Sequence, residues 1–405
     1  MKKQIPSSLR ICFISRKFGY LWPLCKSLAE RGHDITVITA EHSDGSLTQE
    51  LEGVHVHFVE GSLMGEDAMK DAVLDVLETL HVEKPFDLVH CIGKAGLNIA
   101  LHKKQLGVAL AVDVKGSQLD EIFSILGLTE DTVSSYLKTS FGVAIKFLKS
   151  YFGVDHKLLS KADAVFVTSN QQRDILETYY RIPYMRVYVI PFGIDGSLFE
   201  PKQTGSDILR ELDIPAHSKI IVTATELVNI QETKNLLNAF ERVVIKKPNT
   251  ALIIIGDGPK RKELEFHMLS LALASKVWFL GAMPQKKISD FISTCDVYVN
   301  LYSKSSDFEP TVLQAMAYGK MVVASEVGTS NDVISNGIDG FLLRPTDIPA
   351  LTRLLLDAAS GQLDLEGIGK RARQKILKMF DTGQMVDQTI HAYRKILLAT
   401  GKYKE

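Results

Sequence analysis

The chain has 405 residues, a length that suits two domains of roughly 200 residues each. Its formal net charge is −1 and 45% of its residues are hydrophobic, so the composition gives no support for nucleic acid as a partner. Four scattered cysteines without a C-x-x-C pair argue against disulfides or a zinc site and favour a reducing compartment. The first apolar run is interrupted by Arg16 and Lys17, so neither a signal peptide nor a membrane span is expected.

In the first half, short apolar runs alternate with amphipathic stretches, which is typical of a parallel sheet covered by helices. The expected strands are Arg10–Ile14, Asp34–Ile38, His55–Phe58, Asp87–Cys91, Ala109–Val114, Ala164–Thr168 and Val187–Ile190. The expected helices are Trp22–Arg31, Ala68–Leu80, Leu97–Gln105 and Gln171–Tyr179. Gly32 is predicted to end the first of these helices.

One stretch departs from this alternation. Residues 135–154 (SYLKTSFGVAIKFLKSYFGV) interleave aromatic and aliphatic residues with three lysines. Two interpretations stay open: a helix on an anionic membrane surface, or an ordinary helix that packs on the core and exposes its lysines. The second is favoured, because a few lysines on one helix are common.

The second half repeats the pattern after a linker at Pro191–Asp207, which is rich in Gly, Pro and polar residues. The expected strands are Lys219–Thr223, Ala251–Ile255, Val277–Leu280, Val297–Leu301, Met321–Ala324 and Gly340–Leu343. The expected helices are Lys234–Lys246, Lys260–Leu273, Lys286–Cys295, Thr311–Tyr318, Asn331–Asn336 and Ile348–Ser360. Each half is therefore predicted to be a doubly wound α/β domain whose ligand edge lies at the carboxyl ends of its strands.

The second half contains a tight turn of the kind that every β-α unit needs and a loop that has the form of an anion site. "IIIGDGPKRKEL" is a strand, a turn and a helix, in which Gly256 and Gly258 permit close backbone approach and Pro259 suits a first helical turn. "SSDFEPTVLQAMAYGK" leads from a loop into a helix starting near Thr311, whose free amides and dipole favour a diphosphate group. No P-loop, G-x-S-x-G, H-E-x-x-H or G-x-G-x-x-G pattern competes with this interpretation.

Several segments, in order, resemble the retaining glycosyltransferases of family 4, which have the GT-B fold. They include "LCKSLAERGHDITVIT", "FDLVHCIG", "RVYVIPFGIDGSLFEP", "ALIIIGDGPKRKEL" and "AMAYGKMVVASEVGTSNDVISNGIDGFLLRPTD". The resemblance implies two Rossmann-like domains facing a cleft: an acceptor-side domain at 1–195 and a nucleotide-sugar-binding domain at 196–382. It also implies that a last segment, 383–405, forms a helix crossing back onto the N-terminal domain.

The resemblance assigns donor contacts to the second domain. They are Gly256, Gly258, Met283, Ser306, Asp307, Phe308, Pro310, Thr311, Val312 and Gln314. The family has two glutamates seven residues apart here. The second falls on Gln314, implied to bind ribose, and the first on Ser306 by ungapped spacing or on Glu309 by the wording "DFEP". Glu309 is then the implied contact of the donor sugar.

The family's two cations for the leaving diphosphate are altered. Glu226 stands at the arginine position, and Lys234 is the best match for the lysine. Because a diphosphate leaving group needs cationic or N–H stabilisation, either Glu226 points away, or Lys260, Arg261 or Lys304 substitutes, or transfer is weak or lost.

On the acceptor side, the resemblance points to six residues. Lys115 replaces the family's catalytic histidine and is followed by Gly116. Arg16, Lys17 and Gly19 follow the first strand, where the family has a glycine-rich loop. Arg16 and Lys17 could supply cationic contacts there, and the alternative is that they belong to a solvated basic loop. His90 is expected at a strand end facing the cleft, against the alternative of a structural histidine.

The sequence therefore predicts a cytoplasmic, metal-independent, retaining hexosyltransferase, with Glu309, Lys234 and Lys115 as catalytic residues and no cofactor beyond a UDP- or GDP-linked nucleotide-sugar co-substrate. The acceptor is a carbohydrate, lipid-linked or protein hydroxyl, and any peripheral membrane contact would be at the inner face. The alternative, based on the substitutions at Glu226, Gln314 and Lys115, is a catalytically degenerate accessory subunit of a partner glycosyltransferase.

Overall fold

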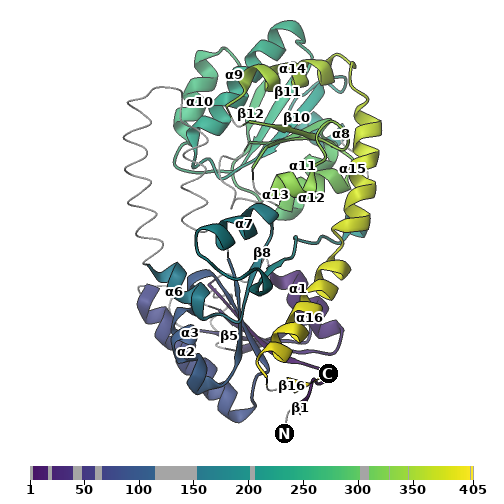
Figure 1. The fold of residues 1–405 in the computed structure, drawn as a ribbon. Coiled ribbons are helices and arrows are strands. Elements are labelled where there is room, and N and C mark those ends of the chain that lie inside the picture. The colour runs from purple at the N-terminus through teal and green to yellow at the C-terminus, as the bar shows by residue number, and fades with distance from the viewer. Residues whose placement is uncertain are drawn as a thin grey trace. The chain divides into compact units, whose positions relative to one another are not determined.

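The computed structural model describes residues 3–16, 21–39, 48–59, 66–114, 153–200, 206–301, 310–327, 329–344, 346–401 and 403–404. The chain forms two compact units: the first contains the described residues up to Gly193 together with Thr382 onward, and the second contains the described residues of Ile194–Asp381 (Figure 1). The predicted stretch at 135–154 lies almost wholly outside the described residues.

The first unit is built on an eight-stranded sheet in the order β4-β5-β3-β2-β6-β7-β8-β9. Its strands are β2 (Arg10–Ser15), β3 (Asp34–Thr39), β4 (Thr48–Leu51), β5 (Val54–Phe58), β6 (Leu88–Ile92), β7 (Ala109–Asp113), β8 (Ala164–Val167) and β9 (Val187–Val189). All neighbours run parallel except β4, which pairs antiparallel with β5. Because both faces of the sheet are covered, the central strands are buried and mostly apolar, as in β6 and β8.

Two apolar cores lie on the two faces of this sheet. The helices of the unit are α1 (Trp22–Glu30), α2 (Glu66–Glu83), α3 (Leu97–Leu106), α6 (Val154–Lys161), α7 (Asn170–Thr178) and α16 (Thr382–Ala399). Short 3-10 turns occur at Gly93–Gly96 and Tyr184–Arg186. As predicted, the chain turns at Gly32 directly after α1, with a φ of +86° that favours glycine.

The C-terminal helix α16 belongs to the first unit, where it packs beside α1 (Figure 1). Its residues Val386, Tyr393 and Leu397 have no exposed surface and join the core that includes Phe13 and Leu28. A two-residue strand β16 (Tyr403–Lys404) then pairs in parallel with β1 (Lys3–Gln4). Both ends of the described chain are therefore tied to the same unit.

The second unit has a six-stranded, fully parallel sheet in the order β12-β11-β10-β13-β14-β15. Its strands are β10 (Lys219–Ala224), β11 (Thr250–Ile255), β12 (Val277–Phe279), β13 (Val297–Asn300), β14 (Met321–Ser325) and β15 (Phe341–Leu343). Its helices are α8 (Ser206–Glu211), α9 (Ile230–Lys246), α10 (Arg261–Ser270), α11 (Gln285–Thr294), α12 (Pro310–Ala317), α13 (Thr329–Val333), α14 (Ile348–Ala359) and α15 (Leu365–Met379), with a 3-10 turn at Gly196–Leu198.

The predicted α/β class with two Rossmann-like halves is confirmed. The described elements that were not predicted are β4, α6, α8 and α15, together with the two-residue strands β1 and β16 and the short 3-10 turns. The predicted helix at Asn331–Asn336 is instead the shorter α13, which ends at Val333. All four cysteines are buried and unbridged, in agreement with the sequence. None of the described helices is both long and apolar enough to cross a membrane.

Candidate functional site

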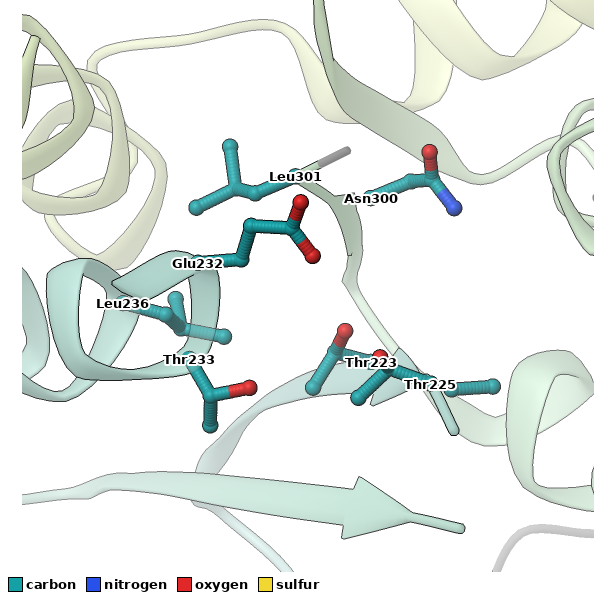
Figure 2. A pocket seen from close by; sticks show the side chains of 8 residues that line it. Thr223, Thr225, Glu232, Thr233, Leu236, Asn300 and Leu301 are labelled. Carbon is teal, nitrogen blue, oxygen red and sulfur yellow. The ribbon is translucent and has the colours of Figure 1, made fainter. Parts of the chain in front are cut away.

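A crevice lies at the point where the strand order of the second unit reverses. In chain order the six strands are arranged 3-2-1-4-5-6, so β10 and β13 are neighbours whose following helices cover opposite faces. The crevice opens at their carboxyl ends and is lined by Thr223, Thr225, Glu232, Thr233, Asn300 and Leu301, among others (Figure 2). This is the position where open α/β sheets bind ligands.

The start of α9 brings polar groups to this crevice. Asn229 caps the helix, because its side-chain oxygen accepts a hydrogen bond from the backbone N–H of Gln231 at 3.1 Å. Asn229 Nδ2 in turn donates to Glu232 Oε1 at 2.9 Å, so the carboxyl group is held in the first helical turn, where the helix dipole favours negative charge. Glu232 is buried, and Figure 2 shows its head directed toward the strand ends.

The amide of Asn300 faces away from that carboxyl group (Figure 2). Alternation along β13 explains this direction, since Leu301 points to the α9 side and Asn300 to the side of Tyr298. Asn300 is buried, and its Nδ2 atom has no hydrogen-bond partner. A buried donor without a partner is rare in proteins, so the carboxyl end of β13 is a place where a ligand acceptor atom would be stabilised.

Lys234, the predicted cation for a leaving diphosphate, does not line this crevice. It lies in the second turn of α9 because the helix begins at Ile230, four residues earlier than predicted. Its Nζ atom is 3.1 Å from Glu263 Oε1 on α10, and Lys260 Nζ approaches Glu263 Oε2 at 3.5 Å. The hydrogen bond from Lys234 lowers the pKa of the Glu263 carboxyl below its usual value. Lys234, the best match for the family's lysine, therefore forms an ion pair with Glu263 of the neighbouring helix α10.

The Gly-Asp-Gly-Pro turn between β11 and α10 packs against the segment that follows β10. A Cβ atom on Gly256 would lie 1.8 Å from the carbonyl oxygen of Thr225, and one on Gly258 would lie 2.0 Å from that of Glu226. The glycines are therefore required by contact between two backbone segments. The same contact orients Leu227 inward, fully buried with a φ of +49°, while Glu226 is exposed to solvent.

The first turn of α12 carries the second predicted ligand region. Thr311 is buried and its hydroxyl oxygen accepts a hydrogen bond from Tyr298 of β13 at 2.8 Å. Gln314, one turn later, accepts a hydrogen bond from Gln285 Nε2 at 3.0 Å. The helix begins at Pro310, one residue earlier than predicted, as suits proline at a first helical position. Val312 is buried behind these residues and Met283 is half-buried.

Many of the predicted site residues lie outside the described residues. They are Lys17, Gly19, Lys115, Gly116, Lys304, Ser306, Asp307, Phe308 and Glu309. The choice between Ser306 and Glu309 for the donor sugar therefore stays a prediction. Among the described catalytic and donor residues, the structure places Thr311 and Gln314 on one helix, and Lys234 on another helix in contact with α10.

In the first unit, Arg16 follows β2 directly, with its side chain exposed. His90 differs from expectation: it is in the middle of β6, not at its end, and only 2% of its surface is exposed. Its Nδ1 atom is 2.7 Å from the hydroxyl of Tyr393 on α16, and burial lowers the pKa of the imidazole to about 3. The sequence did not predict this burial, because a single polar residue within an apolar run can lie either at the end of a strand or in the core.

Sequence reasoning missed Glu232, Thr223 and Asn300, which line the crevice. Two signals were present. Thr223 and Asn300 are polar residues at the ends of otherwise apolar strands, and Asn229 with Glu232 three residues later forms a helix-capping pattern. That pattern would also have placed the start of α9 correctly.

Comparison with known proteins adds to this geometry. Residues 206–375 match the family model "Glycosyl transferases group 1", and residues 20–193 match "Glycosyl transferase 4-like domain". The chain is 22% identical over 392 residues to N-acetyl-alpha-D-glucosaminyl L-malate synthase of Bacillus anthracis, covering 92% of each chain. It is 26% identical over 253 residues to alpha-maltose-1-phosphate synthase of Mycolicibacterium smegmatis, covering 58% of this chain and 64%, less than two thirds, of that relative.

The fold is similar to that of Anabaena HepE, solved in complex with UDP and glucose. The TM-score is 0.73 at 19% identity, and the match covers 95% of this chain and 98% of that one. Likeness at this level of identity concerns the arrangement of the strands and helices. Because the match covers 95% of this chain, both of its sheets correspond to sheets of the HepE fold.

Proposed function

Since this chain belongs to the family-4-like glycosyltransferases of group 1, with the GT-B fold, we propose that it moves a hexosyl group from a nucleotide-sugar to an acceptor hydroxyl with retention and without a metal ion. The observation that carries the proposal is the crevice at the strand-order reversal of the second unit, bordered by the start of α9. The UDP in the HepE complex supports a nucleotide-sugar donor, linked to UDP or GDP.

In this proposal the second unit holds the donor. The backbone amides in the first turn of α12 bind the diphosphate, and Gln314 hydrogen-bonds a ribose hydroxyl on the next turn. The bond between the anomeric carbon and the diphosphate oxygen breaks, and a bond to the acceptor oxygen forms on the same face of the sugar. The acceptor proton passes to the leaving diphosphate. Stabilising the charge that develops on that group is the largest task of the site.

The test is isothermal titration calorimetry of the full chain with UDP, GDP, UDP-glucose and GDP-mannose, followed by mass spectrometry for loss of the bound donor. Saturable binding of one nucleotide together with donor turnover supports the proposal. A folded protein that binds none of the four would contradict it. Circular dichroism and a cooperative thermal transition establish folding in both cases.

A specific observation favours a second candidate, an accessory subunit without transfer activity. Among the described residues that line the crevice there is no lysine or arginine, while Glu232 contributes a carboxyl group, and Lys234 is paired with Glu263. Nucleotide binding without any turnover would support this candidate. So would activity of a co-purified glycosyltransferase that depends on this chain.

A further inference from the structure

A basic groove lies in the first unit, between the helix α16 and the segment that leads into β2. Its volume is about 470 Å³, within the usual range of sites for small molecules. Because residues 4–7 on one side of it precede β2, the groove lies near the amino end of that strand, opposite the edge where open α/β sheets bind their substrates. Figure 1 shows β1, β16 and both chain ends beside the last turns of α16.

One wall of the groove carries three basic side chains. His391, Arg394 and Lys395 line it from the C-terminal half of α16, and their spacing of three and four residues places them on one face of the helix. All three are exposed. No aspartate or glutamate is among the described residues that line the groove, and within the described part of the chain no carboxyl group pairs with Arg394 or Lys395. The groove is therefore positively charged.

The opposite wall is the segment of residues 4–7, which is held at both of its ends. On one side β1 pairs with β16, and the backbone N–H of Ile5 donates to the carbonyl oxygen of Lys404 at 3.3 Å. On the other side the backbone N–H of Leu9 donates to Nδ1 of His33 at 3.0 Å. A wall that is fixed before a ligand arrives saves the entropy of ordering it on binding.

The charge of Arg394 acts on its surroundings. The pKa of the His33 imidazole lies below its usual value, first because burial disfavours the charged form and then because Arg394 and Arg31 are positive. Arg31 forms an ion pair with Asp387. Arg394 has no such carboxyl partner among the described residues, so its charge is available to an anion in the groove.

These groups define the chemistry of a ligand. Arg394 presents a planar fork that matches two phosphate oxygens, and Lys395 beside it adds a second permanent positive charge. His391 adds a third when it is protonated, while Gln4 and Ser7 of the opposite wall can donate neutral hydrogen bonds. A phosphate monoester carries between one and two negative charges at neutral pH and has three acceptor oxygens, whereas a carboxylate has one charge and two oxygens. The phosphate monoester therefore fits this set of donors better.

We propose that the groove binds a phosphate monoester group, carried by a soluble sugar phosphate or by the head group of a lipid. Arg394 and Lys395 bind the phosphate. The space is larger than a phosphate group alone, and the carbon skeleton attached to it packs against the apolar residues Ile5, Pro6 and Leu398. This site belongs to the first unit and the proposed donor crevice to the second, so the inference does not depend on the proposed function.

The primary test is isothermal titration calorimetry of the full chain with glucose 6-phosphate, with glucose as the neutral probe. We expect saturable binding of glucose 6-phosphate only. The double variant Arg394→Gln/Lys395→Gln should weaken it about tenfold or more, because two charge-assisted contacts are lost. The control Lys104→Gln/Lys157→Gln removes the same charge from exposed lysines of α3 and α6 that do not line the groove, and should leave the affinity within about twofold.

Flotation with phosphatidylcholine vesicles, with and without phosphatidic acid, separates the two sources of the phosphate group. Retention on phosphatidic acid vesicles that is lost in the groove variant, without binding of glucose 6-phosphate, assigns the lipid head group. Binding of glucose 6-phosphate without retention on vesicles assigns the soluble ligand. Binding of neither probe overturns the proposal, and so does binding that the two double variants weaken equally or not at all.

Circular dichroism establishes that each variant is folded. If Arg394→Gln/Lys395→Gln is not, Lys395→Gln alone should weaken binding about threefold or more, through one lost charge at an exposed position. Loss of UDP binding by the wild-type chain would contradict the proposed function and leave the assignment of the groove standing.

Discussion

The two glycines of the Gly-Asp-Gly-Pro turn provide a direct test of what that motif does in this chain. In Gly258→Ala the new methyl group would lie 2.0 Å from the carbonyl oxygen of Glu226 and 3.0 Å from that of Leu227. An ordinary contact of 3.4–4 Å is 1.4–2 Å longer than the first of these distances, and Leu227 cannot move outward without exposing a fully buried side chain. We expect a loss of about 2–4 kcal/mol in the free energy of unfolding, the range for overpacking plus local backbone displacement.

Urea unfolding is the assay for this loss. The two tryptophans lie in different units, Trp22 in α1 and Trp278 in β12, so fluorescence in a Trp22→Phe background reports on the second unit. Gly337→Ala is the control, because Gly337 has a positive φ of +76° but open space around it, and it should cost only about 1 kcal/mol. If Gly258→Ala were as stable as wild type but lost nucleotide affinity, the glycine would serve ligand approach, and the packing explanation would be refuted.

Three further outcomes are expected. Lys234→Ala should lower the rate of sugar transfer about tenfold or more at intact fold, the scale of one lost charge-stabilising donor, whereas Lys262→Ala, on the exposed side of α10, should not change it in the same initial-rate assay. Gln314→Ala should weaken calorimetric UDP affinity about fivefold through one lost hydrogen bond, while leaving the thermal midpoint within a few degrees of wild type. The pKa of the His90 imidazole is about 3 in the folded chain and about 6.5 in the unfolded chain. As the pH drops below 6.5 the unfolded chain binds the proton first, so the free energy of unfolding falls. Between pH 6.5 and 4.5 the free energy of unfolding in urea should fall by about 2–3 kcal/mol more for wild type than for His90→Phe. Equal decreases in the two proteins would refute the low pKa of His90.

The sheets could be predicted because the physics that forms them is local. A parallel strand covered on both faces is a short apolar run, and β11 and β13 are such runs bounded by turn residues. The antiparallel strand β4 was missed because it is a short edge strand, and its sequence, TQEL, carries no apolar run. An edge strand is specified by its neighbour more than by its own residues.

The site was less predictable, because its contacts are tertiary. Nothing near Lys234 in the sequence indicates that Glu263, 29 residues later, pairs with it; the pairing follows from the packing of α9 on α10. The hydrogen bond from Tyr298 to Thr311 likewise depends on how α12 lies on the sheet. The sequence predicts which residues stand near the carboxyl edge, but the approach of helices decides which of them stay available to a ligand.

Charge is what separates the two candidate functions. At a site where a diphosphate leaves, each well-placed cation or N–H donor contributes a few kcal/mol, and a carboxyl group nearby opposes it. Glu232 lies at the crevice and Lys234 is paired, so the described part of the proposed donor site would rely on backbone amides and neutral side chains. Backbone amides at a helix start are fixed in place and favour the binding of an anion such as a diphosphate. Turnover requires more stabilisation in the transition state than in the bound donor, and for that step Lys234 would have to exchange Glu263 for the diphosphate. Substituting Glu263→Gln, which weakens the competing pair while keeping its shape, should therefore raise kcat if the chain is an active transferase, whereas an accessory subunit would show no turnover in either form.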